Sequence, residues 1–84
     1  MNIGTGQLQI QELQANFNFL RACATQEGFF KLYFNALPAH RTQVECFNHL
    51  NDRYFDLVGE YRYSGYETFK VLMGRYRKNK KEAQ

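Results

Sequence analysis

The sequence of 84 residues contains no tryptophan, a single proline (Pro38) and only two cysteines, Cys23 and Cys46. One proline leaves long stretches of the chain free to form helices, because proline is the residue that most strongly interrupts them. Two cysteines are too few for the disulfide framework of a small secreted domain, so we expect a reduced, cytoplasmic protein with buried free thiols. A single bridge between Cys23 and Cys46 is the alternative.

Long apolar runs and chemical motifs are also missing. No run approaches the ~20 residues of a transmembrane helix, and residues 1–6 lack the parts of a signal peptide, so we expect no membrane association. The chain has no glycine-rich phosphate loop, no CxxC pair and no HxxxH pair. Cys46 and His49 stand one helical turn apart, but a closed zinc site needs four ligands. We therefore expect no metal, no cofactor and no catalytic residues.

Aromatic residues, by contrast, are abundant. Eight phenylalanines and six tyrosines make up 17% of the chain. Aromatic side chains bury large areas, which allows a small domain to fold without disulfides. Apolar residues recur at helical spacing almost throughout. The sequence predicts a single all-α domain over residues 1–84: a small helical bundle of three long helices and one short helix with an aromatic-rich core, and with residues 1–6 and 80–84 flexible.

The first helix is predicted from about Gln7 to Thr25, with Thr5 or Gly6 near its N-cap. It carries two apolar stripes. The larger stripe consists of Ile10, Leu13, Phe17, Leu20 and Ala24. The smaller stripe consists of Leu8, Ala15, Phe19 and Ala22. A helix that is apolar on two sides packs between neighbours or at a subunit interface. We expect the larger stripe to enter the core, and a homo-oligomer contact through this helix is the alternative.

The next segment, Glu27 to Leu37, is the hardest to assign. From Phe29 onward only Lys31 and Asn35 are polar, and this spacing favours a short buried helix that Pro38 ends. The same residues have a high propensity for β-structure, but a lone strand would find no partner in this chain. We predict a helix, and a strand is the alternative.

A third helix is predicted from about Ala39 to Tyr61. Its apolar arc consists of Val44, Phe47, Leu50, Tyr54, Phe55, Leu57, Val58 and Tyr61. The opposite arc is acidic and would suit a basic protein partner. The alternative is that these acidic side chains only face solvent and bind nothing. The candidate partner-binding residues on it are Glu45, Asp52, Asp56 and Glu60.

The fourth helix follows Ser64-Gly65-Tyr66-Glu67, which fits a capping box in which Ser64 caps the helix. This helix is predicted to fray near Asn79. Helical spacing on the apolar arcs of three helices defines the expected core. Its members are Phe17, Leu20, Phe47, Leu50, Tyr54, Leu57, Phe69, Leu72 and Tyr76.

The positive charge is confined to the end of the chain. Residues 68–84 hold six basic residues and one acidic residue, a net charge of +5, whereas residues 1–67 hold five basic and seven acidic residues, a net charge of −2. Segregated positive charge attracts polyanions, and aromatic side chains can stack on unpaired bases. The same residues would otherwise serve only the helix dipole and solubility.

We therefore predict a small non-enzymatic protein that is associated with nucleic acid through the basic face of the last helix. The alternative is a protein-interaction module, such as an inhibitor, adaptor or assembly factor, that uses the acidic face or a homo-oligomer interface. The candidate nucleic-acid-binding residues are Arg62, Lys70, Arg75, Arg77, Lys78, Lys80 and Lys81.

Overall fold

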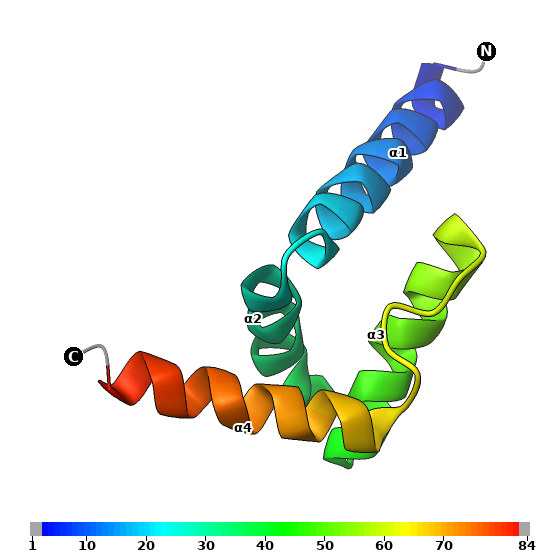
Figure 1. Ribbon diagram of the computed structural model, residues 1–84. Coiled ribbons are helices and arrows are strands. Elements are labelled where there is room, and N and C mark those ends of the chain that lie inside the picture. The colour runs from blue at the N-terminus through cyan, green and yellow to red at the C-terminus, as the bar shows by residue number, and fades with distance from the viewer. Residues whose placement is uncertain (1–2, 83–84) are drawn as a thin grey trace.

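The computed structural model describes the backbone of residues 3–82 and the side chains of residues 9–79. Four helices make up this part of the chain (Figure 1). They are α1 (Ile3–Cys23), α2 (Gln26–Ala36), α3 (Gln43–Val58) and α4 (Tyr66–Glu82), with a 3₁₀ turn, η1 (Leu37–Ala39), after α2. The described residues contain no strand, so the prediction of an all-α fold with three long helices and one short helix is confirmed.

The segment after Thr25 is a helix rather than a strand. Thr25 has an extended backbone, and its hydroxyl accepts a hydrogen bond of 3.0 Å from the amide of Gly28, which caps α2. Pro38 follows in the 3₁₀ turn, where it stops the α-helix. One side of α2 is buried, through Phe29, Phe30 and Tyr33.

The ends of α1 differ from the prediction. The helix begins at Ile3, so Thr5 and Gly6 lie inside it and neither is its N-cap. It stops at Cys23, because Thr25 belongs to the start of the next helix. The prediction placed Thr25 inside the first helix. Its backbone is extended instead, as that of a residue whose side chain caps a helix is.

The opposite end of the chain also differs. The predicted flexibility of residues 1–6 and 80–84 concerns in part residues 1–2 and 83–84, which lie outside the described residues. Within the described backbone, α4 continues to Glu82, so the predicted fraying near Asn79 is wrong. The run of basic residues after Arg75 therefore extends the helix, which lysine and arginine allow because both are good helix formers.

α3 is shorter than predicted, spanning Gln43–Val58 instead of Ala39 to Tyr61. The hydroxyl of Thr42 accepts a hydrogen bond of 3.1 Å from the amide of Glu45 and so caps the start of the helix. Gly59 ends it in the left-handed conformation, with φ 88°, which glycine adopts at little cost.

The predicted capping box before α4 does not form. The carbonyl of Gly65 accepts a hydrogen bond of 3.2 Å from the amide of Phe69, so Gly65 occupies the N-cap position directly before Tyr66. The hydroxyl of Ser64 pairs with the hydroxyl of Thr68 at 3.1 Å instead. The residue at the cap was therefore wrongly predicted.

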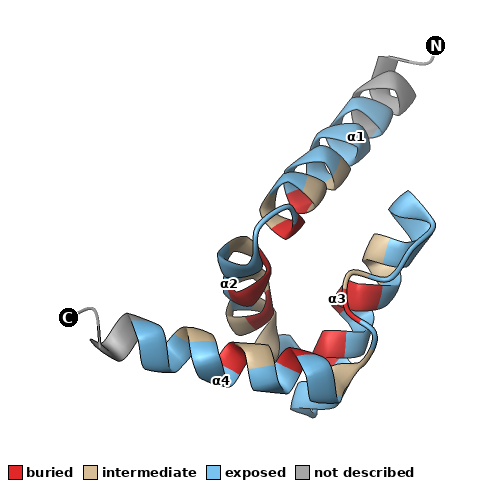
Figure 2. Ribbon diagram, in the orientation of Figure 1, coloured by how far each residue is buried: buried red, intermediate tan, exposed pale blue. Residues whose placement is uncertain are grey.

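The core is a cluster of aromatic rings enclosed by α2, α3 and α4 (Figure 2). Phe69 of α4 is fully buried in it. Six aromatic rings lie with their centroids 4.9–6.3 Å from that of Phe69, most of them edge-to-face, an arrangement that stabilises beyond simple burial of area. These rings belong to Phe29, Phe30, Tyr33, Phe47, Tyr63 and Tyr66.

The predicted core is only partly confirmed. The buried members are Phe47, Leu50 and Phe69. The members that pack against the core while partly exposed are Leu20, Tyr54, Leu72 and Tyr76. Phe17 and Leu57 are exposed, at 64% and 37%, so they were wrongly placed in the core. Further members of the apolar arc of α3 are also exposed, namely Val44, Phe55, Val58 and Tyr61.

α1 presents its smaller apolar stripe to the rest of the molecule. Phe19 and Cys23 are buried. The guanidinium of Arg53 lies 4.3 Å from the ring centroid of Phe19, and Arg53 Nη2 donates a hydrogen bond of 3.2 Å to Asn16 Oδ1. A cation over an aromatic face is an attractive contact. These contacts turn Phe19 toward α3 and leave Ile10, Leu13 and Phe17 of the larger stripe exposed. Leu20, of the same stripe, packs against the core.

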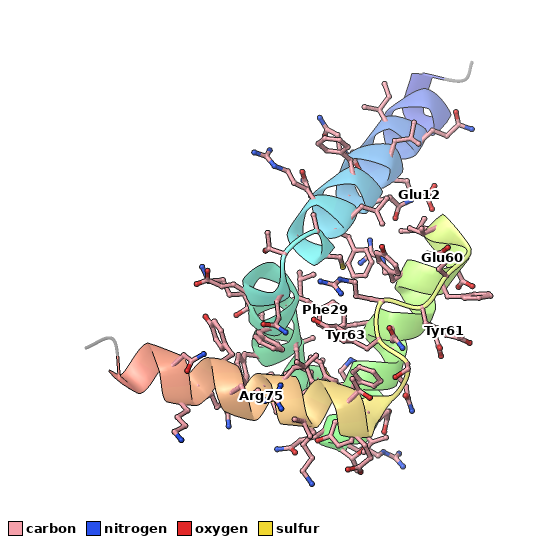
Figure 3. The ribbon with its side chains drawn as sticks, in the orientation of Figure 1. Glu12, Phe29, Glu60, Tyr61, Tyr63 and Arg75 are labelled. Atoms are coloured by element: carbon pink, nitrogen blue, oxygen red, sulfur yellow. The ribbon has the colours of Figure 1, made fainter. Side chains whose placement is uncertain are left out.

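The segment between α3 and α4 is fixed by hydrogen bonds to its backbone. Asn51 is buried; its Nδ2 donates to the carbonyl of Tyr63 at 2.9 Å, and its Oδ1 accepts from the amide of Tyr63 at 3.1 Å. Arg62 Nε donates to the carbonyl of Cys23 at 2.8 Å. Tyr63 therefore stays at the centre of the molecule, beside Phe29, as Figure 3 shows. The direction in which α4 leaves α3 follows from this joint.

α1 and α4 extend beyond the core as two arms (Figure 1). The chain measures 55 × 26 × 25 Å and has a radius of gyration of 15.2 Å. A compact domain of this length would have a radius of gyration of about 12 Å. The arms therefore carry much of the surface on which a partner would bind.

Among the described residues, no helix has both the length and the apolar character that crossing a membrane requires.

We expect Phe47→Ala to lower the free energy of unfolding by about 3–5 kcal/mol, because the side chain is almost fully buried among aromatic rings. Phe55→Ala on the same helix is the matched control, since that ring is 40% exposed and stacks only on Tyr61. Urea titration followed by circular dichroism measures both. Equal losses in the two variants would contradict the position assigned to the core.

Asn51→Asp tests the joint before α4. The carboxylate keeps an acceptor for the amide of Tyr63 but cannot donate to its carbonyl, and it brings a negative charge into a buried position. We expect a loss of about 1–3 kcal/mol at neutral pH, and a smaller loss at acidic pH, where the carboxyl is protonated and can donate. Urea midpoints across pH measure this, and a loss that does not change with pH would contradict the proposed hydrogen bonds.

Candidate nucleic-acid interface

The structure places four of the predicted nucleic-acid-binding side chains on the exposed surface of α4. They are Lys70, Arg75, Arg77 and Lys78. The side chains of Lys80 and Lys81 lie outside those that the structure describes, although both residues belong to the helix. The described basic residues fall within nine consecutive positions, which span about 12 Å of helix.

The opposite side of α4 holds the helix on the body of the protein. Phe69 and Met73 are buried there. At the two ends of this contact, Tyr66 Oη donates to Gln43 Oε1 at 3.1 Å, and Tyr76 Oη donates to Glu27 Oε1 at 3.2 Å. Because the apolar side is occupied by these contacts, the basic side must face solvent.

Among the described side chains, no acidic residue pairs with the cations of α4. α4 has no acidic residue between Glu67 and Glu82, and none of its described cations forms an ion pair. The ion pair that the described residues do form lies on α2, between Lys31 and Glu27 at 3.7 Å. Figure 3 shows where Arg75 lies on α4. The positive field of the helix is therefore directed at whatever approaches from solvent.

Arg77 differs from its neighbours, because its guanidinium lies 4.7 Å from the ring centroid of Phe34 on α2. This contact holds the side chain against the body at the edge of the basic face. Lys70, Arg75 and Lys78 have no described contact of this kind. We define these three residues as the basic face of α4.

Arg62 does not lie with the other candidate residues. It is half-buried, its Nε is bonded to the carbonyl of Cys23, and its guanidinium lies 4.7 Å from the ring centroid of Tyr63. These contacts tie the segment before α4 to the end of α1. Arg62 therefore has a structural role at the joint, which its position in the sequence, before the basic run, did not reveal.

The acidic candidate residues are exposed, as expected of either a partner-binding or a solvated face. Glu45, Asp52 and Asp56 lie on α3. Glu60 does not share their stripe, because α3 ends at Val58 and Gly59 turns the chain away. The expected continuous acidic stripe is thus shorter by one residue, and its role in binding a protein stays a prediction.

Cys23 and Cys46 are buried and form no disulfide with one another, as expected from the sequence for free thiols. Burial raises the pKa of Cys23 to about 11, against the opposing effect of the guanidinium groups of Arg62 and Arg53. Burial also raises the pKa of Cys46, whose Sγ donates to the carbonyl of Tyr33 at 3.6 Å. Thiols whose pKa is raised in this way are poor nucleophiles at neutral pH.

No metal centre is formed by the part of the chain that the structure describes, where no group of three or more histidine, cysteine, aspartate or glutamate residues comes together. His49 is exposed, and its ring lies 5.1 Å from that of His40 between centroids. Cys46 points into the core instead. The pair at positions 46 and 49 is therefore divided between the core and the surface.

One exposed surface was not among the candidate sites. The larger apolar stripe of α1 leaves Ile10, Leu13 and Phe17 exposed at 59%, 69% and 64%. Together with the end of α3, it lines a groove of about 560 Å³. The groove residues are Ile10, Leu13, Gln14, Asn16, Phe17, Leu20 and Leu57. The signal in the sequence was the presence of two stripes on one helix, of which the core takes only one.

A comparison with protein-family models, with curated proteins and with solved structures finds no match to this chain. Functional inference therefore depends on the surfaces just described.

The buried thiols give a testable expectation. Because folding raises the pKa of Cys23 from 9.0 to about 11, the contribution of this group to stability is complete below pH 9 and is lost as the pH rises toward 11. We expect the urea midpoint to fall over this range, and to fall less in Cys23→Ala.

In the folded protein at about pH 8, both thiols should react with a disulfide reagent on the order of 10²-fold more slowly than in concentrated guanidinium, because reaction waits for the structure to open. Rapid reaction of either thiol in the folded state would contradict its burial.

Proposed function

We propose that the protein is a small non-enzymatic nucleic-acid-binding protein of the cytoplasm that contacts phosphate groups through the basic face of α4. The observation that carries the proposal is the exposure of Lys70, Arg75 and Lys78 on one projecting helix whose opposite side is occupied by the core. A projecting helix can approach a polyanion without interference from the slightly acidic body.

The length of the basic face suits phosphates in series. Lys70 and Lys78 are eight residues apart, about 12 Å along the helix axis. Double-stranded DNA carries one negative charge per ~1.7 Å of its axis, so several phosphates lie within this span. Each lysine or arginine that meets a phosphate releases condensed counterions, and this release favours binding.

Binding of this kind is independent of sequence. The exposed side chains of the face are lysine and arginine, which meet phosphates, and α4 offers no cluster of asparagine and glutamine residues to read base edges. Val71, which is 53% exposed, and Gly74 lie between the cations and present no polar group to a base. We therefore expect similar affinity for unrelated sequences of equal length.

The test is a titration of a labelled DNA duplex and a labelled single strand by fluorescence anisotropy. With three or four phosphate contacts, the affinity for duplex should fall on the order of 10²-fold between about 50 and 200 mM salt. Absence of any affinity for either probe at about 50 mM salt would overturn the proposal.

Two triple variants with the same net charge separate the basic face from charge in general. The first changes Lys70, Arg75 and Lys78 to glutamate, and the control changes Arg21, Lys31 and Arg41 to glutamate. All six side chains are exposed, and either set of three reversals changes the net charge from +3 to −3.

We expect the first variant to lose binding at about 50 mM salt and the control to keep most of it, because only the first removes adjacent phosphate contacts. Arg77 is left in place in both variants, since it packs on Phe34. Equal losses in the two variants would show that net charge, rather than the face of α4, determines binding.

A further inference from the structure

The larger apolar stripe of α1 is the most exposed apolar surface that the structure describes. Ile10, Leu13 and Phe17 each expose more than half of their surface, and Leu57 at the end of α3, which lines the same groove, exposes 37% of its own. Apolar patches of more than a few hundred Å² are rare on proteins that remain monomeric. A partner that covers this surface is therefore expected.

The body of the protein cannot cover this stripe. Phe19 and Cys23 turn the opposite side of α1 toward the core, and the contact between Arg53 and Asn16 holds that orientation. α1 is about 31 Å long, and its N-terminal half extends beyond the other helices (Figure 1). The end of α3 reaches the stripe through Leu57, but Ile10, Leu13 and Phe17 stay exposed beside it.

The elongated shape gives the chain more exposed surface than a compact protein. The chain has an accessible surface of 6447 Å². A compact protein of this mass has about 5200 Å². The excess, on the order of 1000 Å², is shared between the arms formed by α1 and α4 (Figure 1), and a standard protein interface takes ~800 Å² from each partner.

The chemistry of the groove fits a second copy of the same chain. None of its seven lining residues is charged, and its polar members are the amides of Gln14 and Asn16. Glu12 lies on the side of α1 that faces α3 (Figure 3) and does not line the groove. Two identical uncharged surfaces meet without like-charge repulsion, and the amide of Gln14 can bond to its equivalent across the contact.

We propose that the protein forms a two-fold symmetric homodimer in which the apolar stripes of two antiparallel α1 helices pack against each other. The exposed part of the stripe, Ile10 to Phe17, is centred near Leu13, so Leu13 of each copy meets its equivalent and Ile10 meets Phe17. The rest of each chain follows the C-terminal end of α1, and the antiparallel arrangement places the two bodies at opposite ends. It thereby also keeps apart the two segments of net charge +5.

The first test is the molar mass in solution, measured by analytical ultracentrifugation without nucleic acid, so that its result is independent of the proposed function. The chain has a mass of 10.0 kDa, and we expect a species of about 20 kDa that dissociates on dilution. A monomer at all concentrations, or an assembly larger than a dimer, would overturn the proposal.

Leu13→Glu should raise the dissociation constant at least on the order of 10²-fold, because it brings two carboxylates together at the centre of the contact. Val71→Glu is the matched control, since it places the same charge at an exposed apolar residue of α4 and should leave the dimer intact. Circular dichroism should show the same helix content in both variants. A dimer that survives Leu13→Glu would contradict the position of the interface.

The orientation of the helices is tested by single cysteines in an otherwise unchanged chain. Gln14 and Arg21 are seven residues apart and so lie on the same side of α1. In the antiparallel dimer, Gln14→Cys stands near its equivalent and should form an intersubunit disulfide, whereas Arg21→Cys stands about 20 Å from its equivalent. Cross-linking of both variants would indicate a parallel dimer and overturn the proposed arrangement. The native thiols are buried and do not compete.

Discussion

The packing of Phe69 among six aromatic rings is the contact on which the rest of the structure depends. Five of these rings come from α2, α3 and the segment before α4, and the sixth comes from α4 itself, so one side chain joins every part of the body except α1. A chain of 84 residues buries a smaller share of its surface than a large domain does. Aromatic rings bury a large area per residue, so they make an efficient core for a chain of this size. The fold therefore concentrates its apolar contacts in one place, and the helices extend from there.

This concentration explains why the two proposed binding surfaces lie on the arms. α4 uses Phe69 and Met73 for the core and keeps its cations for solvent. α1 uses Phe19 and Cys23 for the core and leaves most of its larger stripe, Ile10 to Phe17, exposed. The two surfaces differ in chemistry, one cationic and the other apolar and uncharged, so they suit different partners. A dimer formed through α1 would carry two basic helices and could bind a polyanion at two places, which raises affinity without any new contact.

The helical spacing of apolar residues was enough to predict the number of helices, the helical state of α2 and the burial of Phe47, Leu50 and Phe69. It was not enough to choose between the two stripes of α1, because both have the same period and the choice depends on Arg53, distant in sequence, covering Phe19. Of the candidate site, the exposure of the cations on α4 followed from the helical wheel. The structural role of Arg62 did not, since its partner is a backbone carbonyl, which a sequence does not display.

The bonds from Asn51 end on the backbone of Tyr63, which lies in an irregular segment between two helices. Amide protons in such segments usually exchange with deuterium quickly, because solvent reaches them whenever the loop moves. The amide proton of Tyr63 is held by a buried side chain, so its exchange requires α3 and α4 to separate. The exchange rate of this amide proton, in the segment between α3 and α4, should therefore be as slow as that of amide protons within the helices.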